Sequence, residues 1–152
     1  MLERGNADNL HILFSVKITL LMPLRAVTIL VVDDEPALLD SMRSYLSRLG
    51  HKVTAFRNAA AAWESLASED PLPSVAIVDL TLEGMSGEEF IHKVLERDPA
   101  IAVLATSGYP VSLGTLGLPQ GARVATLQKP FTPRMLTEAL ELLLGGEHSA
   151  TG

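Results

Sequence analysis

The sequence predicts one α/β domain built on a five-stranded parallel sheet covered by helices. Strands buried on both faces read as continuous runs of Val, Ile and Leu, and four such runs occur, at ILVVDD, VAIVDL, IAVLATS and VATLQK. Stretches with helical periodicity separate these runs, which favours parallel strands joined by helices. A chain of 152 residues is long enough for one well-buried core and too short for two ordinary domains.

The first half of the chain alternates strand and helix patterns twice. Residues 28–33 are the first expected strand, and a helix begins after Pro36 and ends at Gly50. The apolar face of this helix carries Leu39, Met42, Leu46 and Leu49. Residues 53–56 form a short second strand, and Asn58 is placed to cap a second helix. Helical spacing relates Ala59, Ala62, Trp63 and Leu66, which predicts that Trp63 packs in the core.

A third strand and a third helix follow. Residues 75–79 are the third expected strand, an apolar run that ends in Asp79. Ser86 and Glu89 have the spacing of a capping box, in which each side chain bonds to the other residue's backbone N–H. The helix that they start has an apolar face formed by Phe90, Ile91, Val94 and Leu95. Pro99 is expected to close it.

The last third of the chain contains two strands with little helix between them. Residues 101–106 and 124–127 are the fourth and fifth expected strands. The segment 109–122 between them holds three glycines and two prolines, which predicts that the fourth helix is short or absent. Thr132 and Pro133 start the final helix. Its inward face is predicted to carry Met135, Leu136, Ala139, Leu140 and Leu143.

The two ends of the chain fall outside this pattern. The domain is predicted to span residues 27–146, with an N-terminal extension over 1–26 and a tail over 147–152. Lys17 interrupts an apolar stretch already shorter than the roughly 20 residues of a membrane helix, so no membrane span is expected. Two alternatives stay open for residues 1–21: a disordered start-site extension, or a segment that docks as an edge strand or self-associates.

Composition excludes several classes of function. The net charge of −6, with only 12 Lys and Arg residues, argues against a direct nucleic-acid partner. No cysteine is present, which rules out disulfides, thiolate catalysis and Cys-ligated zinc, and agrees with a cytoplasmic location. His11, His51, His92 and His148 lie outside the apolar runs and their ends, and are predicted to be surface residues rather than metal ligands.

Chemically reactive side chains stand at the ends of the four apolar runs. Asp33 and Asp34 end the first, Asp79 the second, Thr106 and Ser107 the third and Lys129 the last. Because parallel strands share a direction, their carboxyl ends share one edge of the sheet, where open α/β folds bind their ligands. The sequence therefore predicts a single site at this edge.

The chemistry of this site follows from its charges. Three clustered carboxylates repel one another, and a bound cation would offset this repulsion. Oxygen ligands of this kind favour Mg²⁺, which is expected to bind to Asp34 and Asp79. A carboxylate can also attack phosphorus when nearby cations neutralise the transferred group. Asp79 suits this role because it ends a central strand, and Lys129 supplies the countercharge.

These motifs carry a family resemblance. ILVVDDEP, VAIVDLTLEGMSG, LATSGY and LQKPF, in this order, resemble the signatures of receiver domains of two-component response regulators, over about residues 28–144. The resemblance implies a doubly wound, flavodoxin-like sheet of strand order 2-1-3-4-5, the order known for chemotaxis receivers. It further implies a receiver that accepts a phosphoryl group from a histidine kinase or phosphotransfer protein. Because the remaining residues leave no room for an output domain, we expect a stand-alone receiver that signals through protein contacts.

The resemblance also assigns roles to residues. Asp79 would be the phosphoacceptor, Asp33 and Asp34 the acidic pair that organises Mg²⁺, and Thr81 the donor of a backbone carbonyl ligand. Ser107 would hydrogen-bond the phosphoryl group and Lys129 would contact one of its oxygens, with a cis bond between Lys129 and Pro130. The result would be a self-modifying switch that also loses its own phosphate, rather than a turnover enzyme.

The sequence departs from the family pattern at two positions, and two alternative functions stay open. Thr126 stands where the family often has an aromatic switch residue, and Glu83 where it often has proline, although Gly84 and Gly87 keep this loop turn-forming. One alternative is a phosphorylation-independent interaction module with a receiver fold, although such modules usually lack an acid or the lysine. The other is a dehalogenase-type phosphatase, whose D-x-D motif is missing here because Thr81 occupies the second position.

Overall fold

The structure, a computed structural model, describes residues 25–145 and shows an α/β fold with one five-stranded sheet. The strands are β1 (Thr28–Val32), β2 (Lys52–Phe56), β3 (Val75–Asp79), β4 (Ala102–Ser107) and β5 (Arg123–Gln128). All neighbouring pairs are parallel and the order is β2-β1-β3-β4-β5, which confirms the predicted topology. The alternatives for residues 1–21 and the tail over 147–152 lie outside the described residues.

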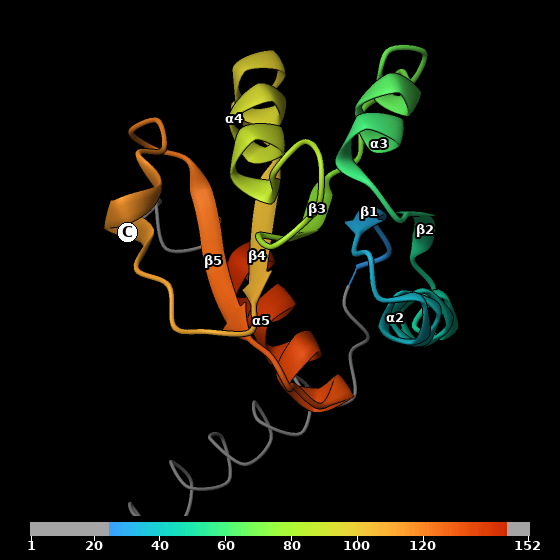
Figure 1. Cartoon of the computed structure of the whole chain (residues 1–152). Helices are drawn as coiled ribbons and strands as arrows, with labels where there is room; N and C mark the ends of the chain where they lie inside the picture. The colour runs from blue at the N-terminus through green and yellow to red at the C-terminus, as the bar shows by residue number, and fades with distance from the viewer. Residues whose placement is uncertain (1–24, 146–152) are drawn as a thin grey trace, which may run out of the picture.

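The helices cover both faces of the sheet (Figure 1). α2 (Pro36–Arg48) and α5 (Pro133–Gly145) pack on one face, and α3 (Ala59–Leu66) and α4 (Gly87–Arg97) on the other. Each face has its own core, because alternate strand residues point to opposite sides. We call the face under α2 and α5 the α2/α5 face and the other the α3/α4 face. No helix in the described part of the chain is long and apolar enough to cross a membrane.

The helix starts follow the sequence closely. The Asn58 side chain accepts a hydrogen bond from the Ala61 N–H at 2.8 Å, as the capping prediction requires. Ser86 Oγ accepts from the Glu89 N–H at 3.1 Å, which is the Ser half of the predicted capping box. Trp63 packs against the core of the α3/α4 face, as predicted, and the Lys93 ammonium lies 5.4 Å from the centre of its ring.

A short 3₁₀ helix takes the place of a fourth crossover helix. η1 (Leu113–Leu116) is the regular element described between β4 and β5, in agreement with the glycine and proline content of this segment. Leu116 is buried in the core of the α3/α4 face. The His92 side chain, on α4, donates a hydrogen bond through Nε2 to the Leu116 carbonyl oxygen at 2.8 Å. His92 is half-buried, and this hydrogen bond joins α4 to η1.

Three predictions of side-chain burial are wrong. The apolar patterns predict Met135 and Leu49 on inward helix faces, but these residues are 41% and 36% exposed. Leu136, Leu140 and Leu143 form the buried stripe of α5, so Met135, one residue before Leu136, is rotated out of it by about 100°. Leu49 follows the last residue of α2. His51 is predicted at the surface and is only 5% exposed.

His51 is buried because it holds the start of the first strand. Its Nδ1 accepts a hydrogen bond from the Val27 N–H at 3.2 Å, just before β1. Nδ1 can accept only in the neutral form that carries its proton on Nε2. Burial lowers the pKa of His51 below its usual 6.5.

We expect acid to destabilise the fold through His51. Below about pH 6.5 the unfolded chain takes up a proton that the folded His51 resists, so the free energy of unfolding should fall with pH in that range. Urea denaturation at pH 7.5 and 5.5 measures this change. His51→Asn, which keeps an acceptor near the Val27 N–H, should show a smaller loss between the two pH values. An equal loss in both proteins would contradict the assignment.

Candidate functional site

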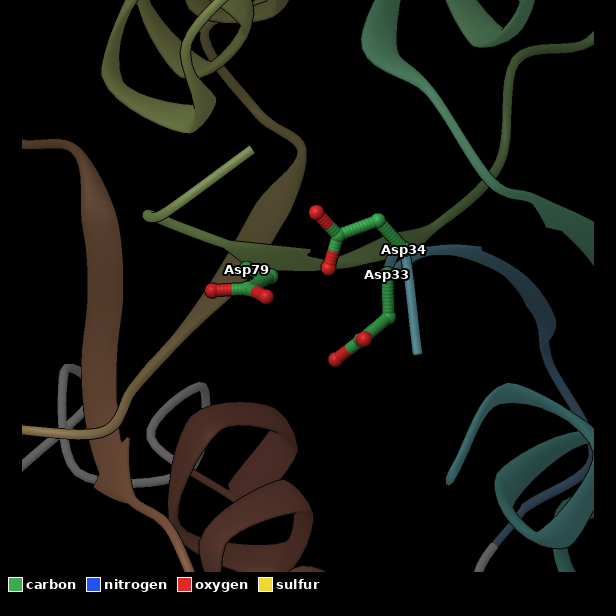
Figure 2. Close-up of side chains that lie close together, drawn as sticks. All are labelled: Asp33, Asp34 and Asp79. Atoms are coloured by element: carbon green, nitrogen blue, oxygen red, sulfur yellow. The ribbon is translucent and has the colours of Figure 1, made fainter. Parts of the chain in front are cut away.

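Three aspartates meet at the carboxyl edge of the sheet. Asp33 and Asp34 follow β1, and Asp79 ends the neighbouring strand β3. Figure 2 shows the three side chains converging on one region, and one carboxylate oxygen from each lies within 4.8 Å of the others. Asp33 and Asp79 are almost fully buried, whereas Asp34 is exposed. The predicted acidic cluster is thus present, with one member open to solvent.

Lys129 reaches this cluster from the end of β5, an edge strand of the sheet. Its Nζ lies 2.9 Å from Asp33 Oδ2 and 3.0 Å from Asp79 Oδ2, with the exposed Glu35 Oε1 at 3.6 Å. Lys129 directly follows β5, and its bond to Pro130 is cis, as the resemblance implied. The ammonium is therefore placed between the two buried carboxylates, as the sequence predicted for Lys129 and Asp79.

Donors from Thr81 and Glu35 fix the other oxygens of the two buried aspartates. Asp79 Oδ1 accepts hydrogen bonds from both the Thr81 N–H and the Thr81 hydroxyl, each at 2.9 Å. Asp33 Oδ1 accepts from the Glu35 N–H at 2.8 Å. These bonds hold each carboxylate in one orientation, with Oδ2 turned to Lys129. Thr81 therefore touches Asp79 through two donors, while its carbonyl as a metal ligand stays a prediction.

Burial and neighbouring charges shift the pKa values of Asp33 and Lys129. Desolvation raises the pKa of Asp33, although the Glu35 N–H and Lys129 oppose the shift. Burial alone would lower the pKa of Lys129, but its close interactions with the Asp33 and Asp79 carboxylates outweigh burial and raise it. Lys129 is thus held as an ammonium beside two carboxylates. A proton or a further cation at Asp33 would offset the cost of burying its negative charge.

Ser107 reaches the same edge without bonding to the acids. It ends β4, directly after Thr106, which pairs in register with Asp79. Its Oγ accepts a hydrogen bond from the Tyr109 N–H at 3.2 Å, and its carbonyl oxygen accepts from the Lys129 N–H at 2.7 Å. Ser107 is buried at the predicted edge, and its role toward a phosphoryl group stays a prediction.

Gly87 shapes the site by a close approach that the motif did not reveal. It is the first residue of α4 and is buried against the end of β3. A Cβ atom at this position would lie 2.1 Å from the Asp79 carbonyl oxygen and 2.7 Å from Leu80 Cα. Real Cβ atoms do not approach backbone so closely, and only glycine lets α4 begin directly on Asp79.

The acidic cluster fits a hard divalent cation. Its donors are all carboxylate oxygens, the ligands that Mg²⁺ prefers, and the exposed Asp34 leaves room for the water molecules that Mg²⁺ keeps. Asp33 Oδ2 is buried, and its ion pair with Lys129 is not aligned as a hydrogen bond, so it retains ligand capacity. The donor set therefore agrees with the predicted cofactor.

Comparison with protein families identifies the family to which the chain belongs. The model of the response regulator receiver domain family matches residues 29–141, a range that includes all the predicted site residues. The chain belongs to this family. Receiver domains generally bind Mg²⁺ at an acidic pocket, and in this receiver the corresponding cluster is formed by Asp33, Asp34 and Asp79.

Curated relatives include proteins that the match covers almost completely and a longer regulator. The chain is 33% identical to a chemotaxis protein CheY homologue of Campylobacter jejuni over 122 residues, which cover 77% of this chain and 92% of the relative. It is also 33% identical to the chemotaxis protein CheY1 of Helicobacter pylori, with 77% and 96% covered. The response regulator Rre1 of Synechocystis is 28% identical, and the match covers 82% of this chain but only about half, 54%, of that relative.

Solved structures agree with the fold. A CheY-like receiver domain protein from Methanospirillum hungatei has a TM-score of 0.70 and 30% identity, over 82% of this chain and 99% of that one. A response regulator receiver protein from Sinorhizobium medicae has a TM-score of 0.69 and 32% identity, over 80% and 96%. The packing of helices on both faces of a 2-1-3-4-5 sheet is thus that of a receiver domain.

Proposed function

We propose that this receiver accepts a phosphoryl group onto Asp79, in a Mg²⁺-dependent reaction, from a histidine kinase or phosphotransfer protein. The observation that carries the proposal is the position of Asp79. Its buried carboxylate lies 3.0 Å from the Lys129 ammonium and within 4.8 Å of a carboxylate oxygen from each of Asp33 and Asp34. A nucleophile beside a fixed cation and a pair of acids that could hold a metal ion suits phosphoryl transfer, in which catalysis is mostly positioning and charge neutralisation.

The reaction forms and breaks one bond to phosphorus. A carboxylate oxygen of Asp79 attacks the phosphorus atom, and the bond from phosphorus to the donor breaks, its electron pair leaving with the donor. Lys129 stabilises negative charge on the phosphoryl oxygens, and a bound Mg²⁺ would supply further neutralisation there. Hydrolysis by water then releases inorganic phosphate and restores the carboxylate. The protein would therefore act as a switch that resets itself.

Asp34→Ala should weaken Mg²⁺ binding at least about tenfold, because loss of a direct ligand should cost no less than loss of an outer partner. Asp34 is the exposed member of the cluster, so its removal leaves the buried ion pairs of Lys129 in place. Titration of ¹H–¹⁵N NMR spectra with MgCl₂ measures the affinity. Glu83→Ala removes an exposed carboxylate from the loop after β3, outside the cluster, and should bind as the wild type does. Equal affinity of all three proteins would exclude Asp34 as a ligand.

The proposed partners are proteins. A histidine kinase or phosphotransfer protein would supply the phosphoryl group in the cytoplasm, and the output would be a protein contact with no direct nucleic-acid binding. The resemblance to chemotaxis receivers of the CheY type supports this proposal. A phosphorylation-independent docking module is the alternative. The ion pairs that join Lys129 to both buried acids favour the phosphoacceptor, because a pure docking role requires none of them.

Labelling with a small phosphodonor tests the proposal without a known kinase. Incubation with acetyl phosphate and Mg²⁺, followed by intact-mass analysis, should show one added phosphoryl group, with acetate as the leaving group. The same incubation with EDTA in place of Mg²⁺ should leave the mass unchanged. An unmodified protein under both conditions would favour the docking module.

A further inference from the structure

Thr106 is a buried polar residue at the site to which neither the motifs nor the proposed reaction assigns a role. It pairs in register with Asp79, and its carbonyl oxygen accepts a hydrogen bond from the Leu80 N–H at 2.9 Å. The side chain is 1% exposed, yet Oγ1 has no hydrogen-bond partner among the described residues. A buried hydroxyl without a partner disfavours the fold that contains it, so its presence calls for an explanation.

The side chain of Thr106 stands on the same face of the sheet as the reactive groups. Alternation along β4 places it with Ala102 and Leu104, which belong to the core of the α2/α5 face. The same alternation places Asp79 with Ile77 and Asp33 with Val31 on this face. Asp33, Asp79 and Thr106 therefore form a row across β1, β3 and β4 at the carboxyl edge.

Lys129 must pass over this row to reach the acids. It starts from the end of β5, and β4 lies between β5 and β3 in the sheet. Its Nζ nevertheless contacts Asp79, which ends β3, and Asp33, which directly follows β1 in the chain. The lysine therefore crosses the carboxyl end of β4, where Thr106 is the residue that faces the α2/α5 side.

We propose that Thr106 is a positioning residue for Lys129 during phosphoryl transfer, an inference that rests on the proposed function. In the resting state the ammonium is directed at Asp33 and Asp79. When an Asp79 oxygen becomes bonded to phosphorus, that carboxylate loses its charge and the ammonium turns to the phosphoryl oxygens. The Thr106 hydroxyl then accepts an N–H that this turn releases. It keeps the ammonium aimed and acquires the partner that it lacks at rest.

Thr54 provides a matched control for a purely structural role. Its Oγ1 is also buried without a partner among the described residues. It lies in the middle of β2, paired with Leu30, at a distance from the carboxyl edge. Thr54→Val and Thr106→Val therefore remove the same kind of hydroxyl and keep the same side-chain shape, so neither should lower stability. Only Thr106→Val removes a hydroxyl from the carboxyl edge, in register with Asp79.

The experiment compares labelling rates with stability. Wild type, Thr106→Val, Thr106→Ser and Thr54→Val are incubated with acetyl phosphate and saturating Mg²⁺, and the initial rate of phosphoryl uptake is measured by intact mass. Urea denaturation of the same proteins measures stability. Thr106→Val should be labelled about tenfold more slowly, the effect of one hydrogen bond to a charged group, without loss of stability. Thr106→Ser, which keeps the hydroxyl, should recover most of the rate, and Thr54→Val should match the wild type.

Three results would overturn the inference while leaving the proposed function intact. Thr106→Val could be labelled at the wild-type rate, Thr54→Val could be slowed equally, or Thr106→Ser could be as slow as Thr106→Val. The last result would show that the methyl group matters and the hydroxyl does not. A wild-type protein that takes up no phosphoryl group would remove the proposed function, and the role of Thr106 with it.

Discussion

Asp79→Asn is expected to abolish phosphoryl uptake from acetyl phosphate. The amide keeps the size of the side chain and an oxygen that can accept from the Thr81 N–H, so the fold should survive. It carries no charge, however, and an amide oxygen is a poor nucleophile toward phosphorus. Intact-mass analysis after incubation with acetyl phosphate and Mg²⁺ should therefore show one added group on the wild type and none on the variant.

Asp98→Asn is a suitable control for this substitution. Asp98 follows α4, and its carboxylate also accepts a backbone hydrogen bond, from the Ala100 N–H at 3.0 Å. The same chemical change is thus made at a second hydrogen-bonded aspartate outside the acidic cluster. Asp98→Asn should be labelled as the wild type is. Wild-type labelling of Asp79→Asn would show that the phosphoryl group is carried elsewhere.

Gly87→Ala is expected to cause the largest loss of stability among single methyl additions. The new Cβ would lie 2.1 Å from the Asp79 carbonyl oxygen, and backbone at the end of a central strand cannot move aside without displacing β3 or α4. Overpacking of this kind costs about 3 kcal/mol at the upper end of its usual range. The free energy of unfolding from urea denaturation measures the loss.

Gly114→Ala tests whether this loss comes from the close approach. Gly114 lies in η1, and the nearest atom to an added Cβ would be Ser112 Oγ at 3.8 Å, an ordinary contact distance. Its stability should stay within about 0.5 kcal/mol of the wild type, as for most surface substitutions. If Gly87→Ala is as stable as Gly114→Ala, α4 does not pack on Asp79 as the structure shows.

The sequence predicts the sheet and the edge of the site because both depend on simple patterns. Continuous apolar runs identify β3 and β4 as strands buried on both faces, and their shared direction brings the residues at their ends together. The short fourth helix follows in the same way from glycine and proline content. The strand order 2-1-3-4-5 came from the family resemblance alone, and the observed pairings confirm it.

Features that depend on distant contacts could not be predicted from local patterns. The burial of His51 requires the Val27 N–H, 24 residues away in the chain, as its partner. Gly87 reads as a turn residue in the sequence, and only the packing of α4 reveals its contact with the Asp79 backbone. Thr106 is visible in the sequence as the end of an apolar run, but only the structure shows that its buried hydroxyl has no partner among the described residues. Each of these depends on the packing of segments that are far apart in the chain.

Chemical localisation of the phosphoryl group tests the central claim most directly. Wild-type protein labelled with acetyl phosphate is treated with borohydride, which reduces an aspartyl phosphate to homoserine, and its peptides are sequenced by mass spectrometry. The account predicts homoserine at position 79 and unmodified aspartate at positions 33 and 34. Homoserine at position 33 or 34, or a labelled protein in which residue 79 remains aspartate throughout, would contradict it.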